Sequence, residues 1–408
     1  MQTIAVNLAD PKTFVDGIPF DEFDRLRREN PVAWHEPFEG RPGFWAVMRY
    51  ADVQHVNRDN ILFSSSRQGT ILSPFMDEES LAQQRLMMLN MDPPMHTRYR
   101  LLVNKGFTPR MITKLEEDIR TRTRDLIAVA TEQGECDFVT DIAAELPLQV
   151  IAEVIGVPQD DRRLVFDWSN RMVGSEDPEY QRANEEAQTA AMELYAYCHQ
   201  LVQDKKGHPG DDIMTVLLNA EVDGHTLSEL ELDMFFMLLC VAGNETTRNL
   251  IAHGQLALFE HPDQAAILQA DPDGTMATAV DEMLRWGTPV MNFRRTATAD
   301  TIIGEQPVSE GDCVMMFYIS ANRDEAVFEN PYTFDVRRTP NEHVAFGGGG
   351  PHFCLGANLA RMEIRVMFEE LVRMVPDMEQ AGPAERLQSN FINGIKHLPV
   401  RFPTGVRA

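Results

Sequence analysis

The sequence predicts a mainly α-helical fold with a small β region and one long central helix. Seven stretches repeat apolar residues with the period of a helix, whereas only three short stretches alternate like strands. These strands are too few and too far apart for an alternating series of strands and helices. The chain has no internal repeat, low-complexity segment or Gly/Ser linker, so residues 1–408 are expected to form a single domain.

The helical and strand-like stretches follow from two different periods of apolar residues. Apolar side chains three and four residues apart fall on one face of a helix, whereas alternate residues fall on one face of a strand. The predicted helices are Asp21–Asn30, Arg110–Gln133, Pro147–Ile155, Asn184–Lys205, Thr226–Phe259, Thr275–Trp286 and Gly356–Val375. The predicted strands are Gly43–Met48, Phe293–Ile303 and Cys313–Ser320.

The longest of these helices, Thr226–Phe259, is predicted to cross the whole domain. Thr226-Leu-Ser-Glu229 is typical of a capping box at a helix start, and no proline follows before Pro262. A helix of this length rises about 50 Å. Met234–Gly243 is apolar on every face, which predicts burial. The polar group Asn244-Glu245-Thr246-Thr247 then stands in the middle of a buried helix, where unpartnered polar groups are costly and therefore need a function.

Composition and charge exclude several classes of protein. The net charge of −26, from 37 basic and 63 acidic residues, disfavours binding to nucleic acid or to an anionic membrane. Met1–Asn7 does not resemble a signal peptide, and the longest apolar run is about half of a membrane span. We therefore expect a cytoplasmic protein without a membrane span.

The five cysteines are odd in number and far apart, which disfavours both a disulfide framework and a zinc finger. Cys136, Cys198, Cys240 and Cys313 are expected to be inert buried thiols.

The fifth cysteine, Cys354, lies in an irregular glycine-rich loop directly before a predicted helix. Residues 346–361 read Phe-Gly-Gly-Gly-Gly-Pro-His-Phe-Cys-Leu-Gly-Ala-Asn-Leu-Ala-Arg, in which four glycines let the backbone approach a flat ligand closely. The helical pattern begins directly after Cys354, and a helix N-terminus favours thiolate. A thiolate ligand pushes electron density onto haem iron and favours O–O cleavage. For an isolated cysteine after glycine, a buried structural thiol would be the better interpretation.

The segment from Phe346 to Arg361 resembles the haem-binding signature of the cytochrome P450 family, although the glycine run here has one extra member. The resemblance extends from Gly43-Phe-Trp to Gly394-Ile-Lys-His. It implies the cytochrome P450 fold, one haem b (iron protoporphyrin IX) and Cys354 as the ligand of the iron. It also implies that Phe346 and Gly356 contact the cofactor.

The central polar group, Ala242-Gly-Asn-Glu-Thr-Thr247, resembles the acid–alcohol motif of the same family. A hydroxyl and an acid together can relay the two protons that O–O heterolysis requires. The match implies that Gly243 leaves space for O₂, that Thr246 hydrogen-bonds it and that Glu245 delivers protons. In an arbitrary helix, the threonine would instead be satisfied by its own helix and the glutamate would face solvent.

Four further residues match family positions that hold the haem propionates, which are carboxylates and need cationic partners. His96 and Arg100 lie one helical turn apart. Arg295, with Arg294 as the second choice, comes from Phe293-Arg-Arg-Thr-Ala-Thr298, and His352 lies two residues before the cysteine.

A structural trio is also implied by the resemblance. Glu282 and Arg285 stand at i and i+3 on one helix face. Arg338, with Arg337 as the alternative, would join them and brace the thiolate loop.

The resemblance implies a monooxygenase that inserts one oxygen atom of O₂ into an unactivated C–H bond of a hydrophobic substrate. Thr70–Met76 and Val165–Val173, in the regions that bind substrate in this fold, are apolar and rich in Met, which suits an adaptable apolar pocket as well as it suits core packing.

Several segments are similar to actinobacterial enzymes that oxidise the terminal methyl of a cholestenone-like steroid side chain or of a methyl-branched lipid. These segments are Val241–Asn249, Trp168-Ser-Asn, Glu176–Tyr180, Ser320–Asp324 and Gly394–His397. The alternatives are a terpenoid or fatty-acid hydroxylase and, in a different class, a non-catalytic haem sensor.

Electrons are expected from NAD(P)H through a separate ferredoxin and ferredoxin reductase, because the chain has no flavin- or iron–sulfur-binding segment. Lys105, Arg110, Arg361 and Arg365 are the basic residues expected to form a local docking patch on a monomeric enzyme.

Overall fold

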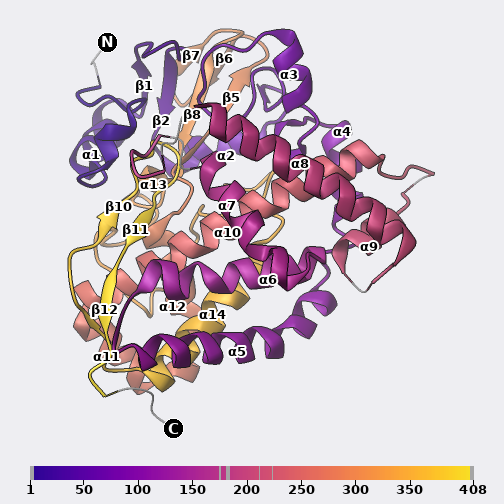
Figure 1. Cartoon of the computed structure of the whole chain (residues 1–408). Coiled ribbons are helices and arrows are strands. Elements are labelled where there is room, and N and C mark those ends of the chain that lie inside the picture. Colours follow the sequence, from indigo (N-terminus) through magenta and orange to yellow (C-terminus); the bar gives the residue numbers. More distant parts are fainter. Residues whose placement is uncertain (1–3, 174–175, 181–183, 211, 223, 405–408) are drawn as a thin grey trace.

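The predicted central helix is α10, which spans Glu229–Glu260 and crosses the middle of the computed structural model (Figure 1). Its 32 residues rise about 48 Å. A capping box is present, but it joins Ser228 to Glu231, so the box predicted at Thr226–Glu229 begins two residues too early. Within the predicted buried run Met234–Gly243, residues as far as Cys240 are mostly buried, but Ala242 is exposed and Val241 and Gly243 are only partly buried, so burial on every face is wrong for the end of the run.

The structure describes residues 4–173, 176–180, 184–210, 212–222 and 224–404. It is mainly helical, with 51% helix and 12% strand, which confirms the predicted fold class. The other helices are α1 (Phe20–Glu29), α2 (Tyr50–Arg58), α3 (Glu78–Gln84), α4 (Met95–Val103), α5 (Pro109–Glu132), α6 (Glu145–Ile155), α7 (Arg162–Val173), α8 (Asn184–Gly207), α9 (Ile213–Leu218), α11 (Pro262–Ala270), α12 (Pro272–Gly287), α13 (Tyr318–Ala321) and α14 (Ala357–Met374).

Every predicted helix is present, and the ends differ by a few residues for local reasons. The start of α12, for example, lies at Pro272 rather than Thr275, because the Asp271 side chain accepts a hydrogen bond from the Gly274 N–H and proline suits the first helical turn. Several short helices, among them α2 and α4, were not predicted.

The helices pack around α10 in layers. In Figure 1, α6 and α8 lie along α10, and α5 and α14 run beside each other at the base of the molecule. Helix α12 contacts both α10 and α14. The largest apolar cluster lies among these helices and includes Phe138, Phe235, Phe236 and Phe368, none of which is more than 1% exposed. This core encloses the middle of α10, where the polar group lies.

The β region is a five-stranded sheet with the order β1-β2-β8-β5-β3, together with three small sheets. Only β2 and β8 pair in parallel; the other pairs of the main sheet are antiparallel. Its strands are β1 (Val32–His35), β2 (Phe44–Val47), β3 (Phe63–Ser64), β5 (Asn292–Ala297) and β8 (Cys313–Phe317). The smaller sheets contain β4 (Glu135–Asp137), β6 (Thr301–Ile303), β7 (Gln306–Val308), β9 (Glu379–Gln380), β10 (Glu385–Arg386), β11 (Ile395–His397) and β12 (Pro399–Arg401).

Two of the predicted strands need correction. Phe293–Ile303 is two strands, because β5 pairs with β8 whereas β6 turns away to pair with β7. Cys313–Ser320 ends as a strand at Phe317, and the short helix α13 begins at Tyr318. In both cases the chain changes partner in space while its apolar pattern continues.

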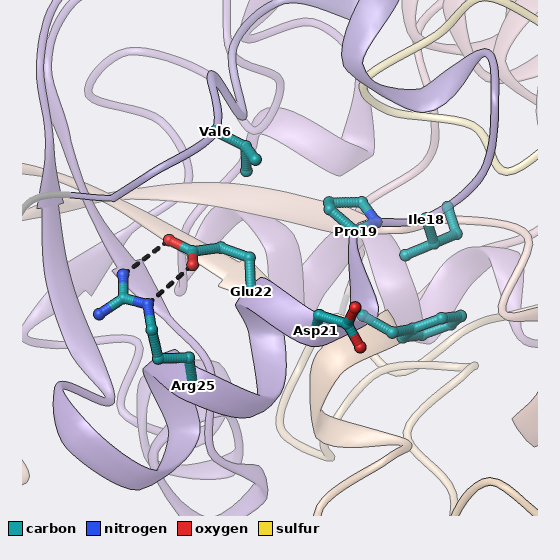
Figure 2. Close-up of a pocket in the computed structure, with 7 residues that line it drawn as sticks. Val6, Ile18, Pro19, Asp21, Glu22 and Arg25 are labelled. Carbon is teal, nitrogen blue, oxygen red and sulfur yellow. Dashed lines mark hydrogen bonds and ion pairs between the residues drawn. The ribbon is translucent and has the colours of Figure 1, made fainter.

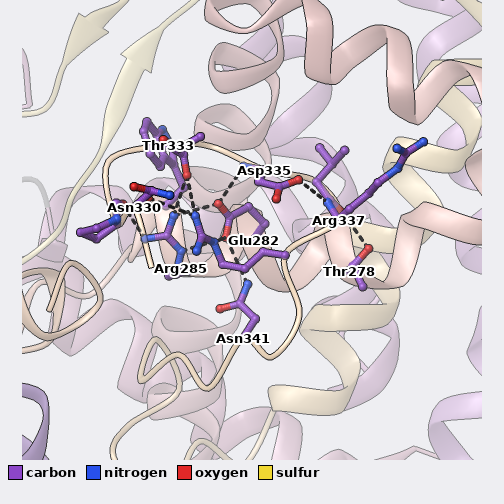
Figure 3. A network of polar contacts seen from close by, with 12 residues as sticks. Thr278, Glu282, Arg285, Asn330, Thr333, Asp335, Arg337 and Asn341 are labelled. Atoms are coloured by element: carbon purple, nitrogen blue, oxygen red, sulfur yellow. Dashed lines mark hydrogen bonds and ion pairs between the residues drawn. The ribbon is translucent and has the colours of Figure 1, made fainter. Parts of the chain in front are cut away.

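The predicted Glu282–Arg285–Arg338 trio is present, with Glu282 and Arg285 buried and Arg338 partly buried (Figure 3 shows the surrounding network). Glu282 and Arg285 are fully buried and 2.8 Å apart, and the Arg338 Nε donates to Glu282 at 3.1 Å. Arg337 contributes only its backbone N–H, to Asp335. Arg338 is therefore the third member. Its guanidinium also donates to the carbonyls of Glu329, Asn330 and Thr333.

The surface carries a shallow hollow beside the start of α1. It is lined by Val6, Ile18, Pro19 and Phe20, with the Glu22–Arg25 ion pair at its edge (Figure 2). The charges of that pair satisfy each other, so they are not available for chemistry.

Within the described part of the chain, no helix has the length and hydropathy needed to cross a bilayer.

Candidate functional site

Cys354 stands at the end of an irregular loop, just before α14. Its N–H donates to the Phe346 carbonyl at 3.0 Å, which closes the loop on itself. Gly347, Gly349 and Gly350 all have positive φ angles, which only glycine adopts without strain. Gly356 is the N-cap of α14, and its N–H bonds the Cys354 thiol. The predicted position of the cysteine at a helix start is therefore confirmed.

Cys354 is the exposed cysteine of the five. Cys354 keeps accessible surface, unlike the buried Cys198, Cys240 and Cys313. Burial is nevertheless the largest influence on its pKa and raises it, while the Gly356 N–H, Arg100 and Arg361 act to lower it. A thiol that is both accessible and desolvated is arranged for a ligand rather than for open solvent.

Four of the predicted cofactor-binding residues meet near this thiol. Burial lowers the pKa of His96 to about 4, with Arg100 and Arg295 adding to the effect. Burial also lowers the pKa of His352, and Arg295, His96 and Arg100 lower it further. The two imidazole rings lie 4.2 Å apart. Because Arg100 and Arg295 lower the pKa of both histidines and Cys354 acts on Arg100, these four residues form one cluster beside Cys354.

This cluster is rich in hydrogen-bond donors and has no matching acid. No carboxylate among the described residues forms an ion pair with His96, Arg100, Arg295 or His352. His96 is 1% exposed, and neither of its ring nitrogens has a partner. The charge of Asp92 acts to raise the pKa of both His96 and Arg295. Its oxygens nevertheless accept hydrogen bonds from the backbone N–H of Ser65 and the hydroxyl of Ser66. Buried donors without acceptors are costly, so the site is built for an anionic ligand.

The residues present fit haem. Two propionates would supply the missing acceptors for the cationic cluster, and the desolvated Cys354 thiol would supply an iron ligand. Four successive glycines leave this part of the loop backbone without side chains.

The alternation of β5 separates the two adjacent arginines. Arg295 is 3% exposed and acts on His96 and His352, while its Nη1 donates to the Arg294 carbonyl at 2.7 Å. Arg294 lies on the other face of the strand, where it acts on Cys313. The geometry therefore favours Arg295 over Arg294 for the cofactor.

Phe346 packs on the outer side of the thiolate loop. The Arg361 guanidinium lies 4.7 Å from the centre of its ring, and the ring of Phe353 lies 6.4 Å away. Arg361 is held in turn by Asp281 at 2.9 Å. Phe346 thus links the loop to α14 and α12.

The acid of the central motif is buried. Glu245 is 3% exposed, so the alternative that it faces solvent is wrong. One carboxylate oxygen, Oε2, accepts from Arg248, whereas Oε1 has no hydrogen-bond partner. Burial raises the pKa of Glu245, and Arg248 acts in the opposite direction. A buried acid with one free oxygen and a raised pKa is suited to passing a proton.

Thr246 and Gly243 lie on other faces of α10. The Thr246 hydroxyl donates to the Ala242 carbonyl at 2.8 Å, so in this state the threonine is satisfied by its own helix. It keeps accessible surface, as does Ala242. A Cβ on Gly243 would stand 2.9 Å from Cδ1 of Ile151 in α6. The missing side chain of Gly243 therefore serves first to let α6 approach α10; the predicted space for O₂ remains a prediction.

Two further polar residues of this helix lie beside Glu245, and no role is predicted for either of them from the sequence. Arg248 follows Glu245 at i+3, the same spacing that singles out Glu282 and Arg285, and that spacing could have identified it. Asn244 is 1% exposed, and neither amide atom has a partner. No pattern in the sequence distinguishes such an asparagine from one that is satisfied.

The expected substrate-binding segments contain both buried and exposed residues. Thr70 is buried and donates to the Asn90 side chain, whereas Phe75 is 76% exposed. In α7, Trp168 donates to Glu193 and packs on Tyr197 of α8. The side chains of Phe166 and Met172 lie outside the described residues.

Most of the basic residues expected to form a docking patch have partners within the same chain. Arg361 pairs with Asp281, and Arg365 pairs with Glu116 at 2.8 Å and with Glu369 at 3.0 Å. Lys105 donates to the carbonyl of Glu221. The side chain of Arg110 lies outside the described residues.

Comparison with known proteins agrees with this geometry. The family model for cytochrome P450 matches residues 148–374. A steroid C26-monooxygenase of Rhodococcus jostii is 44% identical, with 98% of this chain and 85% of that protein covered. A methyl-branched lipid omega-hydroxylase of Mycobacterium bovis is 41% identical, with 95% and 92% covered. The solved structure of a Mycobacterium marinum cytochrome P450 in complex with pseudoionone is 39% identical, covers 98% of this chain and 99% of that one, and has a TM-score of 0.91. The chain belongs to the cytochrome P450 family of monooxygenases.

Proposed function

We propose that this monooxygenase hydroxylates a terminal, unactivated methyl group of a large lipid, with a cholestenone-like steroid side chain preferred over a methyl-branched lipid. The observation that carries the proposal is similarity over nearly the whole chain to relatives of two named kinds, steroid C26-monooxygenases and methyl-branched lipid omega-hydroxylases. Burial of a hydrocarbon substrate in an apolar site would contribute about 25 cal/mol per Å².

Haem, which the family implies, supplies when bound the iron centre at which O₂ is activated. Two groups of residues would hold it. Cys354, kept at the start of α14 by the Gly356 N–H, would serve as the thiolate ligand, with Phe346 and Gly356 contributing to the loop around it. The cluster of His96, Arg100, Arg295 and His352 would supply donors to the propionates. Ser65 orients His352 through a hydrogen bond of 3.1 Å to Nε2.

Protons are delivered by α10. The free Oε1 of Glu245 and the accessible Thr246 hydroxyl lie on successive residues of this helix. Arg248 holds the other carboxylate oxygen, so Oε1 is the oxygen left to carry a proton. When the Thr246 hydroxyl releases its hydrogen bond to the Ala242 carbonyl, it can instead donate a hydrogen bond to O₂ and accept one from water.

Electrons are proposed to come from NAD(P)H through a separate ferredoxin and its reductase. Arg361 and Arg365 form ion pairs with acids of this chain. They would therefore attract an acidic ferredoxin more weakly than unpaired cations would. Any remaining electrostatic attraction between the enzyme and the ferredoxin weakens as the salt concentration rises.

The experiment is a titration panel of cholestenone, a methyl-branched fatty acid, a straight-chain fatty acid and a monoterpene alcohol. Each compound is added to the purified haem protein, and the change from low to high spin and the hydroxylated product are measured. We expect the largest spin shift and terminal-methyl product with cholestenone. A spin shift and product with the monoterpene alone would reject the steroid proposal and leave the monooxygenase assignment intact.

Pseudoionone belongs in the same panel as a second candidate substrate. A relative of 39% identity was solved in complex with it. Tight binding of pseudoionone with no response to cholestenone would favour a terpenoid ketone as the substrate class.

A further inference from the structure

The glycine run of the thiolate loop lies against the end of α2. A side chain on three of its four members would meet α2. A Cβ on Gly350 would stand 2.4 Å from the Asn57 carbonyl oxygen, and one on Gly349 would stand 2.9 Å from the Arg58 Nε. A Cβ on Gly348 would stand 3.0 Å from the side-chain nitrogen Nδ2 of Asn57. The first member, Gly347, has nothing closer than 3.9 Å. The lengthened run is thus shaped to the surface of α2.

The end of α2 is itself anchored. The Arg58 Nε donates to the Gly348 carbonyl at 3.1 Å. Asn57 is 3% exposed, and its Oδ1 accepts from the hydroxyl of Tyr318 at 3.0 Å. Tyr318 is buried and directly follows strand β8 of the main sheet. The sheet, the last turn of α2 and the glycine run therefore form one continuous set of contacts.

Backbone hydrogen bonds carry this anchoring to the cysteine. The Gly350 carbonyl accepts from the Phe353 N–H at 3.3 Å, one residue before Cys354. The Cys354 N–H donates to the Phe346 carbonyl at 3.0 Å, one residue before the glycine run. A shift of Gly350 would therefore move the backbone contact of Phe353, the residue directly before Cys354.

We propose that the last turn of α2, through Asn57 and Arg58, is a positioning element for the thiolate ligand. It holds the glycine run in place, and the run sets the height and direction of Cys354. Arg58 is a positioning residue in this scheme: it acts on the loop backbone and touches neither substrate nor cofactor. The inference rests on the proposed role of Cys354 as the iron ligand.

The first test compares two glycines of the run that share a backbone conformation. Gly347 and Gly350 have φ angles of +97° and +81°, so alanine is strained at both, but only at Gly350 does it also meet α2. The measurements are the fraction of the reduced CO complex with the long-wavelength Soret band of thiolate ligation, the rate at which that band is lost, and the reduction potential. We expect Gly350→Ala to lose the band roughly tenfold faster than Gly347→Ala, because only at Gly350 does the added side chain clash with a packed neighbour. Equal rates for the two variants would overturn the proposal.

The second test uses Arg58, whose exposed side chain can be changed without disturbing the core. Arg58→Ala should speed the loss of the band. Arg58→Lys should return that rate toward the wild-type value, because lysine can still donate to the Gly348 carbonyl. Arg58→Ala should also relieve Gly349→Ala, whose Cβ meets the Arg58 side chain, but not Gly350→Ala, whose Cβ meets the backbone of Asn57. Additive effects of Arg58→Ala and Gly349→Ala would contradict the proposed contacts, and this result does not depend on whether Gly350→Ala folds.

Two controls separate this inference from the function on which it rests. Gly311→Ala, at φ +88° with nothing within 4 Å, measures the strain of alanine away from the loop and should leave the band unchanged. Cys354→Ser should abolish the band, whereas substitutions of the other cysteines should not. If the Cys354 variant keeps a normal band, the ligand assignment fails; if it loses the band while the Gly350 and Arg58 variants behave like wild type, only the positioning role fails.

Discussion

At the scale of single residues, the candidate site combines accessible groups with buried ones that lack partners. Glu245 keeps one carboxylate oxygen free inside a buried helix, and His96 keeps two ring nitrogens free. Stability alone would not favour such groups, because each loses its hydrogen bonds to water without replacement. On the proposed function, their partners would arrive with the cofactor and with O₂.

The role proposed for Thr246 predicts uncoupling when its hydroxyl is removed. Thr246→Ala should still bind haem and substrate, but product formed per NAD(P)H should fall by about tenfold or more, with the difference released as peroxide. Thr247→Ala is the matched control, because Thr247 is 3% exposed on a different face of the helix. Unchanged coupling in the Thr246 variant would make that residue purely structural.

Glu363, on α14, predicts a stability that depends on pH. It is 3% exposed, its Oε2 has no partner, and burial raises its pKa to about 8. Because the carboxyl in the unfolded chain loses its proton near its ordinary pKa of 4.5, the folded state binds more protons between these two pH values and stability falls as pH rises. Glu363→Gln should therefore raise stability by about 3 kcal/mol at pH 7, since a tenfold change in proton affinity corresponds to about 1.4 kcal/mol.

The expected gain should disappear near pH 4, where the carboxyl is protonated in both states. Thermal unfolding midpoints at several pH values measure it. Glu117→Gln, at an exposed position of α5, serves as the control. A Glu363 variant whose gain does not depend on pH would show that the carboxyl has a partner in solution.

At the scale of elements, the site depends on how closely α6 approaches α10. A glycine in a helix interior costs roughly 0.5–1 kcal/mol relative to alanine, so Gly243 must be favoured by its surroundings. The contact with Ile151 supplies that reason, since the two helices could not reach this distance with a side chain between them. The chemical role predicted for Gly243 and this packing role both require the smallest residue.

The packing role predicts a specific rescue. Gly243→Ala should lower the thermal midpoint by the equivalent of about 1–3 kcal/mol, because a Cβ there would stand 2.9 Å from Cδ1 of Ile151. Ile151→Val removes that carbon and should restore part of the loss in the double variant, although it costs about 0.5–1.5 kcal/mol by itself. Strictly additive losses in the double variant would show that the two residues do not meet.

At the scale of the whole molecule, buried charges join segments that are far apart in the chain. Glu282 receives Arg285 from its own helix, Arg338 and Asn341 from a later loop, and the N–H of Asp335 (Figure 3). Arg285 also reaches the carbonyls of Asn322 and Pro331. One glutamate thereby fixes the course of the chain that leads from α13 toward the thiolate loop.

Removing that charge should be far more damaging than removing an exposed one. Glu282→Gln should cost about 3–5 kcal/mol, because it leaves buried arginines without their counter-charge. Glu379→Gln breaks the Arg401 pair, whose side chains are about half exposed (52% and 55%), and should cost about 0–1 kcal/mol. Thermal midpoints and haem content of the two variants would be compared; similar losses would mean that the buried network is not essential.

The features that could be predicted from the amino-acid sequence lie in contiguous segments. The long central helix, the loop around Cys354 and the acid–threonine pair depend on local period, on glycine conformation and on residues a few positions apart. These features are enough to predict the fold class and to identify the family that the comparisons confirm. The propionate-binding residues follow only from the resemblance, and their roles remain proposals.

Which distant residues meet could be learned only from the folded chain. The structure favours Arg295 over Arg294 and Arg338 over Arg337, because the choice depends on the face of a strand or the path of a loop. It also pairs Arg361 and Arg365 with acids and places the end of α2 against the glycine run. Such contacts join residues tens to hundreds of positions apart, and no local period records them. They arise only when the burial of the whole apolar core brings the segments together.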